Sequence, residues 1–341
     1  MESVKIKDIS LGVRPCCLAP MAGTSAVTYR GICHEYGSSF APTELCSARS
    51  IVYNGIEKSF RFLEIDPEAE GITSIQLFGN EPNDFVFAIN EICKDERLKN
   101  VDIIDINMGC PVPKVVKTGA GSALMETPDL AAEIVKASVE TASSYGKPVT
   151  VKTRIGFNEF SGSSLKYIEC LIDSGASMIC VHGRTRAQLY HGVADINALK
   201  EIGEVFKGKD VPYFANGDIT DGKSALNMFE TTNCDGIMVG RAAQGNPWIF
   251  EEIRNYLDGK GENVRVIDGN ERIDVLLREL IGRSEHVGEV TAVKEMRSVM
   301  PNYIKGLRGS TSIKVSLCRA NTISEVKAIL DECRNLWSPE E

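Results

Sequence analysis

The sequence predicts an α/β protein, a (β/α)8 TIM barrel followed by a small all-helical segment, and three observations support this prediction. Short runs of apolar, often β-branched residues recur eight times before the chain changes character. Each run is followed by turn residues and by a stretch long enough for one crossover helix, a spacing that favours parallel strands. Towards the C-terminus the apolar period is helical and carries no strand signal. Eight successive β/α units close into a barrel.

The eight predicted strands cover residues 16–20, 40–43, 74–77, 102–106, 149–152, 178–182, 213–215 and 236–239. Two of the intervening helices carry start signals. Thr127 is expected to cap a helix that opens at Pro128, and Asn80 is expected to cap a helix with Pro82 in its first turn. The buried face of this second helix is expected, from helical spacing, at Phe85, Ile89 and Ile92.

The chain divides into a catalytic barrel over residues 1–250, a linker over 251–269 and a helical domain over 270–341. The run Gly259-Lys260-Gly261-Glu262-Asn263 is typical of a linker. Four helices are predicted after it, over residues 271–287, 290–304, 312–318 and 323–337. Thr322 and Glu325 have the spacing of a capping box at the start of the last helix.

Composition limits the class of protein. With 341 residues and 43% hydrophobic content, the chain buries a full core. Its formal charge of −9 argues against indiscriminate nucleic-acid binding, although a local basic surface is compatible with it. The first residues hold too few apolar side chains for a signal peptide, and no apolar run is long enough for a membrane span, so we expect a cytoplasmic protein. Eleven cysteines without a Cys-x-x-Cys pair, and four scattered histidines, predict no metal site.

Polar residues and glycines gather at the carboxyl ends of the predicted strands, where this fold carries its active site. The most informative run is Asn107-Met108-Gly109-Cys110-Pro111, which places a cysteine directly after a buried strand. A free cysteine is usually a small buried hydrophobe, so it is the position of Cys110 that suggests chemistry. Gly217 and Gly240, with Arg241, predict a phosphate site after the last two strands. The sequence thus indicates a phosphorylated cofactor.

The other strand ends suggest that this cofactor is FMN. Lys152 would place a cation beside a ring that becomes anionic on reduction, and Gln76 can hydrogen-bond a planar ring edge. No Gly-x-Gly-x-x-Gly follows an early strand, which argues against a tightly bound dinucleotide. We therefore expect NADPH or NADH to act only as a transient reductant.

Several ordered motifs resemble those of the tRNA-dihydrouridine synthases, and most closely those of the bacterial B-type subgroup. The motifs are Ala19-Pro20-Met21-Ala22-Gly23, Asp105-Ile106-Asn107-Met108-Gly109-Cys110-Pro111, Val151-Lys152-Thr153-Arg154, His182-Gly183-Arg184-Thr185-Arg186 and Asn216-Gly217-Asp218-Ile219. The cysteine motif continues through Lys114 and Gly119-Ala120-Gly121-Ser122-Ala123-Leu124, as in that subgroup. Ala26 and Thr28 depart from the family pattern, so substrate contacts near them are not inferred.

The resemblance implies a reaction and a set of roles. The reaction is reduction of the C5=C6 bond of specific uridines in tRNA to 5,6-dihydrouridine, with hydride from reduced FMN reaching C6. Cys110 would donate the proton to C5, and Asn107 would touch the uracil. An ordinary cysteine thiol is mostly neutral at pH 7 and suits this role. FMN contacts are implied for Pro20, Met21, Ala22, Gln76, Lys152, His182, Asn216, Gly217, Asp218, Gly240 and Arg241.

Four further residues are candidate contacts to the RNA substrate: Arg154, Arg184, Arg186 and Lys114. Arginine after a strand more often pairs with a neighbouring carboxylate, and a loop lysine, such as Lys114 or Lys117, is as often simply solvated. Glu44 either anchors Arg30 or shapes the flavin pocket.

The predicted helical domain is the expected tRNA-binding surface. Between His286 and Ala320 the sequence holds six basic residues and two acidic ones, a local charge of +4 in an otherwise acidic chain. A solvated helical face would have the same charge, and the resemblance favours the RNA interpretation. No obligatory protein partner is implied. Three alternatives stay open: an FMN oxidoreductase for a free pyrimidine, like dihydroorotate dehydrogenase, the same reduction on ribosomal RNA, and a noncatalytic RNA-binding protein.

Overall fold

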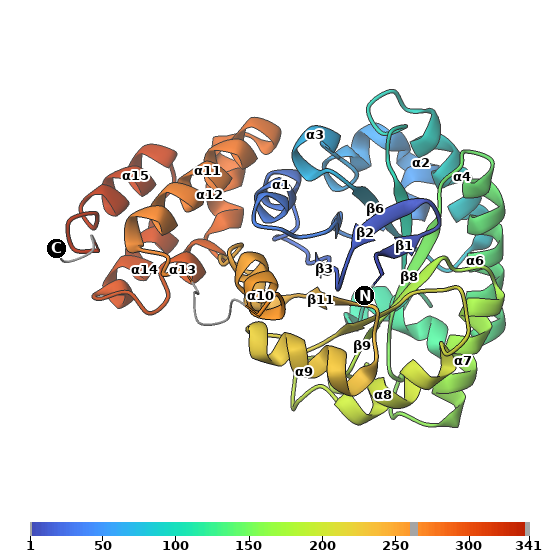
Figure 1. Ribbon diagram of the computed structural model, residues 1–341. Coiled ribbons are helices and arrows are strands. Elements are labelled where there is room, and N and C mark those ends of the chain that lie inside the picture. The colour runs from blue at the N-terminus through green and yellow to red at the C-terminus, as the bar shows by residue number, and fades with distance from the viewer. Residues whose placement is uncertain (1, 260–264, 338–341) are drawn as a thin grey trace.

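A nearly closed barrel of eight parallel strands forms the larger part of the molecule (Figure 1), in a computed structural model that describes residues 2–259 and 265–337. All eight predicted strands are confirmed, with ends that differ by at most two residues. They are β3 (Cys16–Leu18), β4 (Ala41–Pro42), β6 (Thr73–Phe78), β7 (Ile103–Asn107), β8 (Val149–Arg154), β9 (Met178–His182), β10 (Tyr213–Asn216) and β11 (Gly236–Val239).

The last strand, β11, pairs in parallel with the first barrel strand, β3. The seam between β3 and β4 is held more loosely. The amide of Leu18 donates to the carbonyl of Phe40 at 3.2 Å, and the amide of Ser39 donates to the carbonyl of Cys16 at 2.9 Å. Closure brings the carboxyl ends of all eight strands to one rim.

Three short strands were not predicted. β1 (Val4–Ile6) and β2 (Ile9–Gly12) form an antiparallel hairpin, and β5 (Cys46–Ser47) pairs with β6. Ile6 and Leu11 of the hairpin pack against Phe40 and Met178, which lie at the amino ends of their strands. The hairpin therefore closes the amino end of the barrel and leaves the opposite rim for a site. The sequence signal for this hairpin was the alternation of apolar and polar residues in its two strands.

Helices surround the barrel as the alternating pattern requires. They are α1 (Val27–Glu35), α2 (Ala48–Ser59), α3 (Pro67–Glu70), α4 (Pro82–Lys94), α5 (Pro113–Val116), α6 (Pro128–Ser143), α7 (Gly162–Asp173), α8 (Ile196–Val205), α9 (Gly222–Thr232) and α10 (Ile249–Leu257), with short 3-10 turns η1 (Phe60–Phe62), η2 (Gly121–Glu126) and η3 (Arg241–Ala243). The predicted face of α4 is confirmed as buried. Asn80 is not its cap, because Glu81 holds that position. Thr127 does precede α6, but its side chain makes no capping hydrogen bond.

The C-terminal helices are α11 (Gly269–Val287), α12 (Glu289–Met296), α13 (Met300–Tyr303), α14 (Ser310–Arg319) and α15 (Ile323–Asp331). The prediction of one helix over 290–304 was wrong, because Pro301 has no N–H and its ring clashes with the carbonyl four residues before it. The last helix also ends before the predicted residue 337. Thr322 accepts the amide of Glu325 at 3.2 Å, whereas Glu325 reaches Asn321 instead of completing the box.

The predicted linker, residues 251–269, is not extended throughout, since α10 occupies its first part. Most of the run from Gly259 to Asn263 lies outside the described residues. The division into domains stays a prediction. No helix within residues 2–259 and 265–337 has the length and apolar character that a membrane crossing requires.

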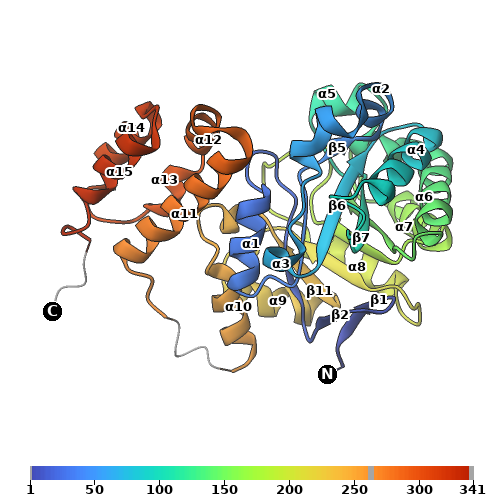
Figure 2. The same ribbon diagram turned by 90° about the horizontal axis from the view of Figure 1, so that it is seen from above.

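A buried polar cluster joins the C-terminal helices to the barrel, where α11 lies beside α1 (Figure 2). Glu279 of α11 accepts hydrogen bonds from Arg283 at 3.0 Å and from the hydroxyl of Tyr303 at 2.6 Å. Arg283 also donates to the carbonyl of Gly23, 3.2 Å away, in the loop after β3. The C-terminal helices thereby hold a loop at the barrel rim.

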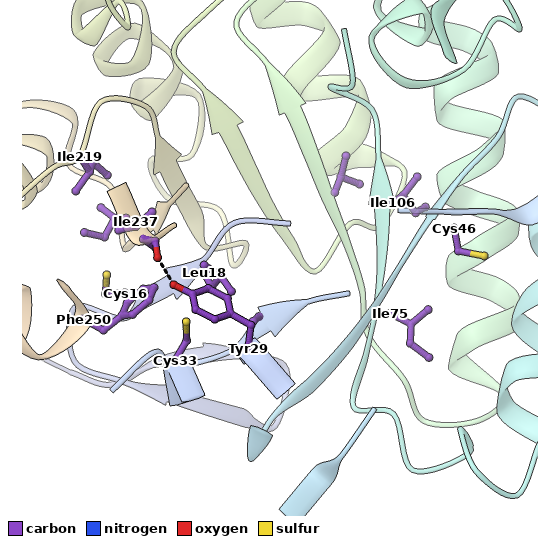
Figure 3. Packing of buried hydrophobic residues seen from close by; sticks show 14 of the residues in the cluster. Cys16, Leu18, Tyr29, Cys33, Cys46, Ile75, Ile106, Ile219, Ile237 and Phe250 are labelled. Atoms are coloured by element: carbon purple, nitrogen blue, oxygen red, sulfur yellow. Dashed lines mark hydrogen bonds between the residues drawn. The ribbon is translucent and has the colours of Figure 1, made fainter. Parts of the chain in front are cut away.

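Buried apolar residues also pack between the first and last β/α units of the barrel (Figure 3). Tyr29 of α1 is completely buried beside Cys33 and Leu18, and its hydroxyl donates to the carbonyl of Ala243, in the turn after β11. The first and last β/α units are thus tied together beneath the C-terminal helices.

Replacing Glu279 with alanine should lower the free energy of unfolding by about 3–5 kcal/mol, because the buried Arg283 would keep only the more distant Glu295 carboxylate, 3.7 Å away, and the Tyr303 hydroxyl would lose its acceptor. Chemical denaturation of the purified protein measures this change. The control is Glu204→Ala, which removes an exposed pair with Lys207 and should cost less than about 1 kcal/mol. Equal losses for the two variants would contradict the prediction.

Candidate active site

Cys110 lies in a tightly held loop at the carboxyl end of β7. The Asn107 side-chain oxygen accepts the amides of Gly109 at 3.2 Å and Cys110 at 2.9 Å. The Cys110 carbonyl accepts the amide and the hydroxyl of Ser122 at 3.1 and 2.9 Å. Eight of the eleven cysteines are buried, whereas Cys110 is partly exposed. The loop therefore presents this thiol at the rim.

The local electrostatics keep the Cys110 thiol protonated. Partial burial raises the pKa of Cys110 above its ordinary value, and this effect outweighs the Val112 amide and the positive charges of Arg154 and Lys152. A neutral thiol holds a proton that it can donate to a carbon atom on which negative charge develops.

Four cations surround His182 at the same rim. Burial is the first reason that the pKa of His182 lies well below its usual range, and Lys152, Arg154, Arg184 and Arg241 lower it further. The imidazole is therefore neutral at physiological pH. Burial also lowers the pKa of Lys152, whose ammonium group donates to the Asn216 side-chain oxygen at 3.1 Å. This excess of positive charge favours an anionic ligand.

Two of the predicted RNA contacts are engaged inside the protein. Arg154 is 4% exposed and donates to the carbonyls of Gly109 at 2.7 Å and Thr185 at 2.9 Å. Arg184 is 2% exposed and pairs with Asp218 at 2.8 Å. Arg184 therefore pairs with a neighbouring carboxylate, the alternative to RNA binding that its place after a strand suggested. Both arginines hold loops together, and their predicted contacts with RNA stay predictions.

Arg186 and Lys114 differ from these two. The Arg186 guanidinium lies over the ring of Phe157, 5.1 Å from its centroid. Lys114 is exposed on α5, beyond the Cys110 loop. Their predicted contacts with RNA stay predictions.

The turns after β10 and β11 carry the residues predicted to hold a phosphate. Gly217 has a φ of +132°, and a Cβ there would lie 2.8 Å from Ala194 and 3.2 Å from the His182 ring. Any side chain at this position would clash and strain the backbone, so the turn requires glycine. Arg241 is 53% exposed and donates to Asp218 at 2.8 Å. A Cβ at Gly240 would be only 3.8 Å from Met21 Sδ, which places the turns after β11 and β3 side by side.

The turn after β3 carries the remaining predicted cofactor contacts, Pro20, Met21 and Ala22. The Met21 carbonyl accepts the amides of Thr24 and Ser25, each at 3.0 Å. Pro20 and Met21 are half-buried and Ala22 is exposed. This turn therefore presents its surface to the rim while its backbone is fixed.

The structure decides the role that the sequence left open for Glu44. Arg30 is bound by Glu70 at 2.6 Å, so Glu44 does not anchor it. The Glu44 carboxylate instead accepts the amide of Gly23, and burial raises its pKa. Glu44 thus shapes the turn after β3 by holding the Gly23 amide, while Arg283 donates to the carbonyl of the same residue.

Gln76 and Asn107 bind each other, since the Asn107 amide donates to the Gln76 oxygen at 2.9 Å. Sequence reasoning missed the neighbour that completes this network, Asp105. An acidic residue inside an apolar strand was the available signal. Within the described ranges, no group of three or more His, Cys, Asp or Glu residues is arranged to hold a metal ion.

A family model for dihydrouridine synthases (Dus) matches residues 17–336. The chain belongs to the dihydrouridine synthase family. It is 34% identical to the probable tRNA-dihydrouridine synthase of Aquifex aeolicus, over 93% of this chain and 95% of that protein. Identity to tRNA-dihydrouridine synthase B of Pseudomonas putida is 35%, over 98% of this chain and 94% of that protein. The family resemblance predicted from the motifs is confirmed.

Solved structures with a similar fold include histamine dehydrogenase from Rhizobium sp. 4-9, with a TM-score of 0.55 and 14% identity over 82% of this chain. A 2-naphthoyl-CoA reductase has a TM-score of 0.56 and 8% identity over 77% of this chain. The chain spans about half the length of these proteins, 50% and 52%. At such low identity the similarity establishes the barrel fold alone.

The depressed pKa of His182 predicts that its ring resonances stay unchanged between about pH 6 and 8, because the imidazole is already neutral there. Nuclear magnetic resonance of histidine-labelled protein measures this. Lys152→Met removes one of the surrounding cations and should move the titration of His182 to higher pH. A wild-type ring that titrates near its ordinary value would contradict the prediction.

Proposed function

We propose that this member of the dihydrouridine synthase family reduces the C5=C6 bond of specific uridines in tRNA, with FMN as its cofactor. The observation that carries the proposal is a protonated, partly exposed Cys110 on the same rim as the cation-rich turn at Gly217. Family membership and curated relatives named tRNA-dihydrouridine synthase support the choice of substrate. A cytoplasmic location follows from that substrate.

The donor set fits a phosphorylated flavin. Gly217, Gly240 and Arg241 would hold the phosphate, while Lys152 would hold the ring edge that gains negative charge on reduction. Pro20, Met21 and Ala22 would cover the ring. The remaining contacts are proposed for Gln76, His182, Asn216 and Asp218. When bound, reduced FMN supplies a hydride to C6 of the uracil, and NADPH or NADH is the proposed transient source of its electrons.

The residues of the chain supply the proton and the geometry. Uracil has its C5=C6 bond conjugated to C4=O, so reduction at C6 sends negative charge towards C5 and O4. Cys110 donates its proton to C5, and the raised pKa keeps that proton on sulfur until the charge develops. Arg154 holds the Gly109 carbonyl and so fixes the loop that carries the thiol. Asn107 lies beside Cys110, where it can touch the base.

A basic surface on the C-terminal helices is proposed to hold the tRNA. Lys294, Lys305, Arg308 and Arg319 are exposed and make no ion pair with any residue of 2–259 or 265–337. Arg297, counted with them from the sequence, instead donates to the carbonyl of Ala320 at 2.7 Å. Exposed, unpaired cations are the groups that bind a phosphate backbone.

The direct test incubates the purified protein with NADPH and tRNA from a strain that lacks dihydrouridine. Mass spectrometry of the digested tRNA should detect a nucleoside two hydrogens heavier than uridine. Parallel reactions with ribosomal RNA and with free pyrimidines test the two alternatives. A product only in those reactions, or in none, would contradict the proposal.

Replacing Cys110 with alanine should slow dihydrouridine formation by about 10²–10⁴-fold, because the proton donor is lost. Flavin content and NADPH oxidation should persist, since they do not use the thiol. Cys318→Ala, which removes an exposed cysteine on α14, is the control and should leave turnover unchanged. An unaltered rate for Cys110→Ala would exclude the proton-donor role.

Reversing the charge of Arg308 and Arg319 should weaken tRNA binding and reduce the slope of log K against log salt by about one per lost phosphate contact. Filter binding over a salt series measures both. The pair Lys207→Glu and Lys209→Glu, two exposed changes before β10 at the other end of the barrel, carries the same reversal of two charges as a control. An equal loss of tRNA binding in the control would show that only net charge matters and would contradict the proposed surface.

A further inference from the structure

Asp105 is a buried carboxylate in the middle of β7, with 1% of its surface exposed. One of its oxygens accepts the Gln76 amide at 2.6 Å, and the other accepts the Thr150 hydroxyl at 2.5 Å. Register explains the arrangement, because Asp105 pairs with Gln76 of β6 on one side and with Thr150 of β8 on the other. The carboxylate therefore lies beneath the rim and links three neighbouring strands.

A chain of hydrogen bonds runs from Asp105 to Cys110. Because the Gln76 nitrogen faces Asp105, the Gln76 oxygen faces Asn107 and accepts its amide at 2.9 Å. The Asn107 oxygen is then directed towards the loop, where it accepts the Cys110 amide at 2.9 Å and the Gly109 amide at 3.2 Å. Reversing Gln76 would turn its N–H groups towards those of Asn107, and reversing Asn107 would turn its N–H groups towards the loop amides. The two orientations are therefore coupled.

Groups that cannot reverse fix the direction of this chain at both ends. The Gly109 and Cys110 amides can only donate, so they require the Asn107 oxygen, and the Asp105 carboxylate can only accept, so it receives the Gln76 N–H. Thr150 cannot decide the direction, since a hydroxyl both donates and accepts. Without an acceptor at position 105 the Gln76 N–H would be buried and unpaired, and the Gln76–Asn107 pair would lose its support beneath the loop.

We propose that Asp105 is a positioning residue of the active site, which sets the orientation of Gln76 and Asn107 and thereby holds the Cys110 loop. The same orientation leaves a second N–H on Gln76 and on Asn107, and these two residues are the proposed contacts to flavin and uracil. The consequence for uridine reduction rests on the proposed function. The effect of Asp105 on the Cys110 loop does not.

The test measures alkylation of Cys110 by iodoacetamide, resolved by peptide mass spectrometry, with the exposed Cys318 as internal reference. Full-length protein is compared flavin-free and with saturating FMN, and circular dichroism confirms the fold of each variant. Asp105→Leu, which keeps the shape but removes the acceptor, should raise the rate of Cys110 relative to Cys318 by at least about threefold, because a loosened loop exposes the thiol and lowers its pKa. Thr150→Val, which removes the other bond to the same carboxylate, should leave that ratio near the wild-type value.

The conservative variant Asp105→Asn supplies the rescue. Its side-chain oxygen can accept from Gln76 while its N–H groups face the Thr150 hydroxyl, which can accept, so every hydrogen bond of the chain is kept. The Cys110 rate in this variant should stay near the wild-type value. An unchanged ratio in Asp105→Leu, or a ratio in Asp105→Asn raised as far as in Asp105→Leu, would overturn the proposal.

If Asp105→Leu does not fold, Gln76→Glu replaces it in the comparison. That variant sets two carboxylates face to face and should raise the Cys110 rate. The double variant D105N/Q76E should lower the rate again, because the amide introduced at position 105 can donate to the carboxylate introduced at position 76. None of these measurements requires dihydrouridine. A wild-type protein that fails to modify tRNA would therefore refute the proposed function and leave this result standing.

Discussion

Parallel pairing of β11 with β3 is the constraint on which the rest of the site depends. The register joins Ile237 to Cys16 and Val239 to Leu18, so the turns that follow the first and last barrel strands meet at one rim. The opposite seam, between β3 and β4, is held by few backbone bonds. At the loop after β3 the C-terminal helices add Arg283, and Glu44 holds the other side of the Gly23 peptide. A part of the molecule proposed to bind tRNA is thus also a brace for the loop proposed to cover the flavin.

Positive charge predominates at the rim, and this excess determines which chemistry the site supports. Four cations surround His182, and Asp218 is bound by two of them, Arg184 and Arg241. The excess of positive charge attracts an anionic cofactor but would also favour a thiolate at Cys110. Partial burial of the thiol acts in the opposite direction and prevails. The site thereby keeps a neutral acid beside a positively charged pocket.

The sequence was sufficient for the eight barrel strands and for the position of Cys110 after one of them, because period and turn residues are local properties. The break at Pro301 was equally local and was overlooked. Partners of the buried arginines were not predictable in the same way. Arg154 bonds to carbonyls that come from two other β/α units, and no local pattern encodes that meeting. The same is true of Asp105, whose neighbours depend on the register of β6 and β8.

Burying the Asp105 carboxylate costs folding free energy, and the direction of its pKa shift shows at which pH this cost applies. Burial raises its pKa from 3.8 to about 6, so the folded protein holds this proton more tightly than the unfolded chain does. The contribution of Asp105 to stability is therefore highest below the unfolded value and declines as pH rises through about 6. At neutral pH the carboxylate is ionised at the expense of folding free energy. An amide of the same size would avoid that cost and could still accept from Gln76, but it would also have a second orientation, with its N–H groups towards Gln76. A carboxylate has no such alternative, so the ionised Asp105 excludes the reversed orientation at a cost in folding free energy.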